Sequence, residues 1–150
     1  MTVPVYKPTR LFTLDQANAM LPLVRAIVRD IADLARELVD RKQRLELLVR
    51  DRPARKSELY SEELDQIEQD LEKDVQRLQA YVDELLELGV ELKSPVDGLV
   101  DFPSIVDGKP ALLCWKLDEP AVLYWHDLES GFAGRQTIGP ETVTDNHDPD

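Results

Sequence analysis

Two long apolar stripes with alternating three- and four-residue steps constrain the fold of this chain more than any other feature. The first stripe consists of Val24, Ile27, Ile31, Leu34, Leu38, Leu45 and Leu48, and the second of Leu64, Ile67, Leu71, Leu78, Tyr81, Leu85 and Leu88. Such steps place side chains on one face of an α-helix. A polar segment with a proline, residues 51–57, separates the stripes and is typical of a turn. The sequence therefore predicts helices over residues 11–50 and 57–89 that pack antiparallel as a hairpin.

Local signals mark both ends of this hairpin. Thr13 and Gln16 have the spacing of a capping box, so the first helix is expected to begin here. Gly89 follows the last apolar position of the second helix and is the expected C-terminal cap. Pro22 lies about two turns into the first helix, where a proline is expected to kink or loosen it.

A charged residue interrupts each stripe, and further apolar residues widen both. Arg41 and Asp74 are the interruptions, and antiparallel pairing brings them opposite each other, so we predict an ion pair that sets the register. The additional apolar positions are Val28, Ala35, Val39, Val75 and Val82. A single antiparallel contact leaves part of this apolar surface uncovered, which predicts a homodimer with a four-helix arrangement.

After Gly89 the apolar pattern changes to the shorter period of β-strands. Short strands are predicted near residues 90–93, 99–102, 111–117 and 121–126, with a tight turn at Asp107-Gly108. Residues 139–150 are polar and acidic, so we expect a disordered tail. The predicted fold class is α+β. One domain spans residues 1–138, with a helical hairpin followed by a small antiparallel sheet and loop over residues 90–138.

Charge and composition exclude several classes of function. The chain of 150 residues carries a formal net charge of −12 at pH 7, which repels phosphate backbones and anionic lipids. We therefore expect neither nucleic acid nor a membrane as a partner, and favour cations or a basic protein partner. The first residues lack the apolar segment of a signal peptide, and Cys114 is the only cysteine. These features predict a cytoplasmic protein without an intramolecular disulfide.

His126 is the strongest candidate for chemistry, and it lies in a cassette that also holds both tryptophans of the chain. With Asp101, Glu119 or Asp127 it can form a carboxylate–imidazole site for a divalent metal. The alternative is a histidine at a sheet edge that binds a carbonyl or carboxylate and holds the following loop. No second histidine at ligand spacing supports the metal, so both interpretations remain open.

Arg135 is the second candidate, because it follows the glycine-containing run Gly131-Phe132-Ala133-Gly134. A guanidinium beside exposed backbone N–H groups can bind a small anion, and the alternative is an ion pair with one of the nearby acids. Trp125 and the neighbouring aromatic residues either line a ligand pocket or belong to the core of the sheet. Cys114 has no close partner in the sequence for a thiolate mechanism, and a nucleophilic pair with His126 rests only on the two being cross-strand neighbours, so Cys114 is interpreted as a small buried apolar residue.

Three segments are similar to a known family. The run Phe12-Thr13-Leu14-Asp15-Gln16-Ala17-Asn18-Ala19-Met20-Leu21-Pro22, the run Gly98-Leu99-Val100-Asp101-Phe102-Pro103 and the Leu-Cys-Trp…Glu-Pro…Trp-His…Gly-Phe-Ala-Gly-Arg cassette resemble the bacterial "domain of unknown function 2203". The resemblance covers residues 11–138, and the cassette is its specific part. It implies a small bacterial protein of unassigned activity, and it assigns no catalytic residue.

Two classes of function follow from the sequence. The first is a non-catalytic interaction or scaffold module with a helical-hairpin dimer. The second is a metal- or ligand-binding protein, or an enzyme, whose site is built from Asp101, Glu119, His126 and Arg135, together with Trp125. Convergence of these side chains on one concavity favours the second class, and scattering or internal pairing favours the first.

Overall fold

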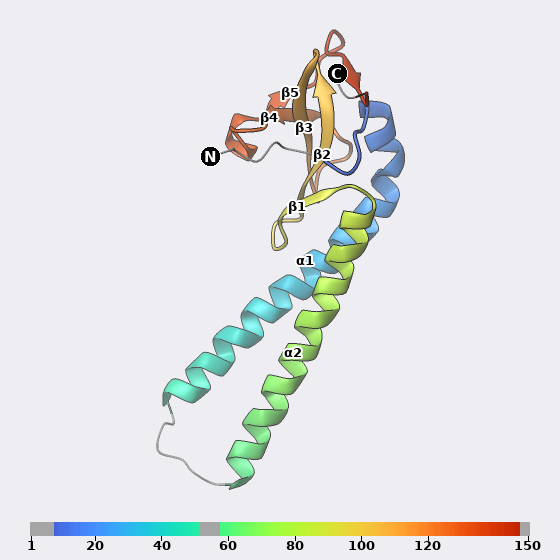
Figure 1. The fold of residues 1–150 in the computed structure, drawn as a ribbon. Helices are drawn as coiled ribbons and strands as arrows, with labels where there is room; N and C mark the ends of the chain where they lie inside the picture. Colours follow the sequence, from blue (N-terminus) through green and yellow to red (C-terminus); the bar gives the residue numbers. More distant parts are fainter. Residues whose placement is uncertain (1–7, 52–57, 148–150) are drawn as a thin grey trace, which may run out of the picture.

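The computed structural model describes residues 8–51 and 58–147 and confirms the predicted α+β architecture. Helices α1 (Leu14–Asp51) and α2 (Glu58–Glu87) form an antiparallel hairpin, and a sheet packs at one end of it (Figure 1). Residues 52–57, which make up most of the predicted turn, lie outside the described residues. Neither described helix is long and apolar enough to cross a membrane.

The sheet has six strands among the described residues. They are β1 (Glu91–Ser94), β2 (Leu99–Val106), β3 (Lys109–Lys116), β4 (Tyr124–Asp127), β5 (Gln136–Thr137) and β6 (Thr144–Asp145). The order is β1-β2-β3-β4-β5, with β6 beside β2, and every pairing is antiparallel. The predicted turn between β2 and β3 is present: Asp107 and Gly108 have φ angles of 50° and 84°, which aspartate and glycine tolerate.

The core lies between one face of the sheet and the half of α1 nearest the sheet. Phe102 and Trp115 are fully buried there, and the ring of Phe12 meets that of Phe102 edge-on at 5.3 Å. Val28 is also fully buried, and a Cβ at Gly98 would lie only 3.2 Å from its Cγ1. The sheet therefore covers much of the wide stripe on α1 that the sequence analysis assigned to a second copy of the chain.

The ends of the hairpin follow the predicted local signals. Thr13 and Gln16 form the capping box, because each backbone N–H donates to the other's side chain, at 3.0 and 3.2 Å. Gly89 has a φ of 85°, and its N–H donates to the carbonyl of Leu86 at 2.9 Å, as a C-terminal cap requires. Helix α1 continues through Pro22.

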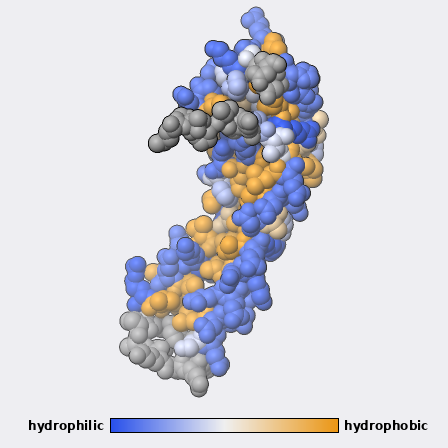
Figure 2. Space-filling model, viewed as in Figure 1, coloured by the Kyte–Doolittle hydropathy of each residue, from blue (hydrophilic) through white to orange (hydrophobic). Residues whose placement is uncertain are grey.

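Beside the turn between β1 and β2, an apolar groove of about 320 Å³ remains open on the hairpin, with Pro95 and Val96 in its lining. Val39 and Val75 are each about half exposed in it, and Figure 2 shows apolar surface continuing along the two helices. The homodimer stays a prediction. Val75 is the position that tests it, because a charge at the buried Val28 would disrupt the monomer itself.

The predicted contact between Arg41 and Asp74 is confirmed, with 2.5 Å between guanidinium nitrogen and carboxylate oxygen. We expect a double-mutant cycle with Arg41→Ala and Asp74→Ala to give a coupling energy of about 1 kcal/mol, because both side chains are largely screened from water, at 23% and 29% exposure. Urea denaturation of the four proteins measures it. Purely additive effects would contradict the pairing.

The segment predicted to be a disordered tail instead packs on the sheet over its described part. Strand β6 pairs with β2, and the backbone N–H of Asp107 donates to the carbonyl of Val143 at 2.9 Å. The hydroxyl of Thr144 accepts a hydrogen bond from the N–H of Leu14, the first residue of α1, at 2.8 Å. The tail is held by hydrogen bonds, from its backbone and from the hydroxyl of Thr144, rather than by apolar burial, so its polar composition does not indicate these contacts. Residues 148–150 of the tail lie outside the described residues.

Candidate functional site

The two faces of the sheet differ in chemistry. Side chains alternate between faces along a strand, so the neighbours of the core residues point to the opposite face. There Asp101 of β2 is paired across the ladder with Cys114 of β3, while His126 of β4 is paired with Leu112 of the same strand β3. Adjacent strands thus bring a carboxylate, a thiol and an imidazole together, although Asp101, Cys114 and His126 are only 2%, 0% and 3% exposed.

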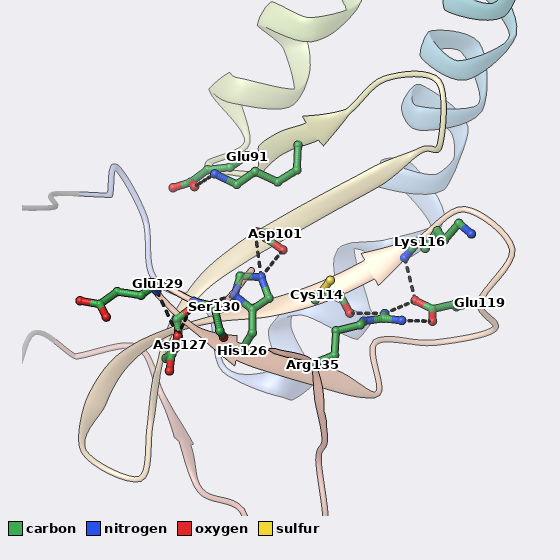
Figure 3. A network of polar contacts seen from close by, with 11 residues as sticks. Glu91, Asp101, Cys114, Lys116, Glu119, His126, Asp127, Glu129, Ser130 and Arg135 are labelled. Carbon is green, nitrogen blue, oxygen red and sulfur yellow. Dashed lines mark hydrogen bonds and ion pairs between the residues drawn. The ribbon is translucent and has the colours of Figure 1, made fainter. Parts of the chain in front are cut away.

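The ring of His126 is held at both nitrogens. Its Nε2 lies 3.1 Å from each carboxylate oxygen of Asp101, and its Nδ1 lies 2.7 Å from the backbone carbonyl oxygen of Asp127 (Figure 3). A carbonyl can only accept, so Nδ1 carries a proton. Nε2 is therefore the nitrogen that is left to hold either a second proton or another ligand.

The surroundings of His126 favour its charged form. Hydrogen bonding raises the pKa of His126 from 6.5 to about 10, and the bond with Asp101 contributes more to this shift than the bond with Cys114. These contacts outweigh burial, which alone would lower the pKa of an imidazole. At neutral pH the protein thus contains a buried imidazolium–carboxylate pair beside the side chain of Cys114.

Cys114 completes a group that the sequence analysis did not assemble. One oxygen of Asp101, the Sγ of Cys114 and a ring nitrogen of His126 all lie within 4.8 Å of one another. The carboxylate of Asp127, which was predicted as a metal ligand, has other partners, because it accepts the backbone N–H groups of Glu129 and Ser130 at 3.0 and 2.7 Å. Asp127 contributes its carbonyl oxygen to His126 instead.

Arg135 and Glu119 form a second pair, as the alternative interpretation of Arg135 predicted. The guanidinium donates to both carboxylate oxygens of Glu119, at 2.8 and 2.5 Å, and lies 4.0 Å from the ring centre of Tyr124. It also donates to the carbonyl oxygen of Cys114 at 3.4 Å. The four predicted site residues are thus arranged as two internal pairs flanking Cys114 (Figure 3), with Glu119 as the ion-pair partner of Arg135. They do not converge on one concavity, as a single site built from all four would require.

Trp125 does not reach either pair. It is partly buried against the core cluster, and it pairs across the sheet with Leu113 and Gln136. Of the two interpretations offered for this aromatic residue, the structure supports membership of the core.

A pocket of about 230 Å³ lies over the carboxylate–thiol–imidazole group. Asp101, Cys114 and His126 all contribute to its lining. The remaining walls are mainly apolar, with one cationic and one anionic side chain, and consist of Lys93, Leu99, Leu112, Leu128, Glu129, Gly131 and Phe132. The three donor groups are therefore reached through this concavity.

Together, the fold and the site define a class of protein: a helical hairpin with a six-stranded antiparallel sheet that buries a carboxylate–imidazole–thiol group on its outer face. The chain belongs to the family described as "Uncharacterized conserved protein (DUF2203)", whose model matches residues 10–138. The resemblance seen in the sequence is thereby confirmed. Comparisons with curated proteins and with solved structures give no match.

Proposed function

We propose that this protein binds a divalent transition metal, with Zn²⁺ as the best-fitting ion, through Asp101, Cys114 and His126. The observation that carries the proposal is the grouping of three donor atoms within 4.8 Å on adjacent strands. In a tetrahedral zinc site with these donors, neighbouring ligand atoms lie about 3.3–3.8 Å from each other. Nε2 of His126 and the oxygens of Asp101 are 3.1 Å apart, so small side-chain rotations suffice to admit the ion.

The contact at Nδ1 of His126 supports this proposal independently. A metal-binding histidine almost always donates its other ring N–H to a carbonyl or carboxylate, which orients the ring and selects the tautomer. The carbonyl of Asp127 accepts such a bond at 2.7 Å. It leaves Nε2 aimed at the carboxylate of Asp101, where a metal ion would replace the proton that the two groups otherwise share.

A nucleophilic role for Cys114 has weaker support. In a thiol–imidazole pair, the imidazole must offer a basic nitrogen to take the thiol proton. Here Nδ1 of His126 donates to the carbonyl of Asp127, and Nε2 faces both oxygens of Asp101. Both nitrogens thus face oxygen acceptors, and neither is a basic nitrogen that could take the proton of Cys114, so metal ligation uses the three groups better than acid–base catalysis does.

Titration of the reduced, metal-free protein with Co²⁺ tests the proposal. We expect one equivalent to bind with a near-ultraviolet thiolate-to-cobalt absorption, which must come from Cys114 because the chain has no other cysteine. Zn²⁺ should displace the cobalt. Cys114→Ser should abolish this absorption, and His126→Asn and Asp101→Asn should each weaken binding at least 10–100-fold.

His147→Asn is the matched control, because His147 is the only other histidine and is exposed. It should bind Co²⁺ like the wild type, and circular dichroism should show that every variant is folded. If the folded wild type binds no stoichiometric metal, or if His147→Asn loses as much affinity as His126→Asn, the group is a structural ion pair and not a metal site.

A further inference from the structure

We infer that the metal bound here keeps one coordination position open to the pocket, and that this position takes a small aliphatic monoanion, such as a short-chain thiolate or carboxylate. This inference rests on the proposed metal site and names the ligand class of that site. The ligand's charged head would bind the metal, and its apolar body would occupy the pocket.

The count of protein donors leaves a position free. Among the residues that the structure describes, Asp101, Cys114 and His126 have no fourth histidine, cysteine or acidic side chain in their group. Structural zinc sites have four protein ligands, whereas zinc sites with three protein ligands keep the fourth coordination position for water or an exogenous ligand.

The open coordination position of the metal faces the pocket. All three donors line the pocket, although each is at most 3% exposed. A ligand therefore reaches the metal by entering the concavity and not from the general surface. Its volume of about 230 Å³ admits several non-hydrogen atoms, since one water molecule takes about 30 Å³ in the liquid.

The side chains that line the pocket indicate the chemistry of the part of the ligand beyond its charged head. Leu99 and Leu112 line the inner part, and Leu128 and Phe132 stand 42% and 46% exposed where their loop borders the pocket. An aliphatic chain in the pocket would cover these exposed apolar side chains. Aspartate and a cysteine thiolate neutralise the charge of a divalent ion, so a monoanion adds one negative charge, which is carried by its head at the metal. Lys93 and Glu129 on the wall have opposite charges, and the ammonium of Lys93 lies 3.1 Å from a carboxylate oxygen of Glu91, so the wall itself selects for the apolar body.

A chain-length series on the Co²⁺-loaded protein tests the inference. Ethanethiol to hexanethiol, and acetate to hexanoate, are added while the visible cobalt spectrum is followed. We expect a spectral change that reports a new ligand, and an affinity that rises about fourfold with each added methylene until the pocket is full. The two series show whether a thiolate or a carboxylate head is preferred.

Two leucines that are both 42% exposed supply a matched pair of variants. Leu128 lines the pocket and Leu123 does not. Leu128→Ala should weaken binding of the longest ligand several-fold and leave that of the shortest unchanged, whereas Leu123→Ala should alter neither. Both variants should bind Co²⁺ as the wild type does.

The outcomes separate this inference from the proposal on which it rests. If Co²⁺ binds but neither series changes its spectrum, the metal is closed and the inference is overturned while the metal site stands. If affinity is independent of chain length and of Leu128, the pocket does not select an aliphatic body, and the ligand class is wrong. If no metal binds at all, both the proposed function and this inference fail.

Discussion

Replacing Trp115 with alanine is expected to lower the free energy of unfolding by about 3–5 kcal/mol. Trp115 is fully buried between the sheet and α1, and the guanidinium of Arg25 lies 5.7 Å from its ring. Its indole N–H also donates to the carbonyl of Glu119 at 3.0 Å, so the substitution removes packing and a hydrogen bond together. Urea denaturation followed by far-ultraviolet circular dichroism measures the change.

Trp125 supplies the control for this prediction. It is only partly buried against the same core, so Trp125→Ala is expected to cost clearly less than Trp115→Ala. Equal losses at the two positions, or a loss below about 1 kcal/mol at Trp115, would contradict the packing described here.

In the metal-free protein, raising the pH from about 6.5 to 10 should lower the free energy of unfolding by up to about 1.4 kcal/mol per pH unit. The pKa of His126 is about 10 in the folded state, against 6.5 for an unperturbed imidazole. Between these values the folded chain holds one more proton than the unfolded chain, so stability decreases as the pH rises. Below pH 6.5 both states bind the proton, and the stabilisation from this group is complete.

Denaturation in the presence of a chelator at several pH values tests this prediction. Asp101→Asn is the informative variant, because it removes the carboxylate that contributes most to the raised pKa of His126. The pH slope of the variant should be flatter than that of the wild type over the same range. An equal slope in the two proteins would show that another group causes the pH dependence.

Features governed by local sequence rules were predictable. The capping box at Thr13, the glycine cap at Gly89 and the Asp107-Gly108 turn each depend on a few neighbouring residues, and all three are present. The contact between Arg41 and Asp74 followed from regular helical spacing extended along the hairpin. A periodic pattern carries this information over long distances because a helix repeats its geometry.

The residues of the candidate site could be predicted in part, but their arrangement could not, because the register between strands is set only when the sheet folds. Asp101 and His126 were selected for their chemistry, but nothing along the chain indicates that Cys114 lies opposite Asp101. The predicted second strand also stopped before Pro103, since proline lacks the N–H that a central strand uses. Here the strand continues, and the carbonyl of Pro103 accepts the N–H of Phe12 at 2.7 Å.

The predicted dimer shows a different limit of the sequence argument. Surplus apolar positions on α1 indicate that something covers them, but they do not say what. Val28 and Ala35 are buried within the single chain, and Val28 belongs to the core that α1 shares with the sheet. The open groove near Val39 and Val75, and exposed apolar residues farther along the helices such as Leu47 and Ile67, remain as surface for a second copy.

The bond between the hydroxyl of Thr144 and the N–H of Leu14 spans 130 positions of the chain, and this has a consequence for biosynthesis. At roughly 5–20 residues per second, a ribosome adds Thr144 about 6–26 s after Leu14. The hydrogen bond at the start of α1 therefore cannot form until nearly the whole described chain has been made. The apolar residues of α1 that pack on the sheet likewise stay uncovered until Phe102 and Trp115 have been made, so the nascent chain exposes apolar surface during that interval.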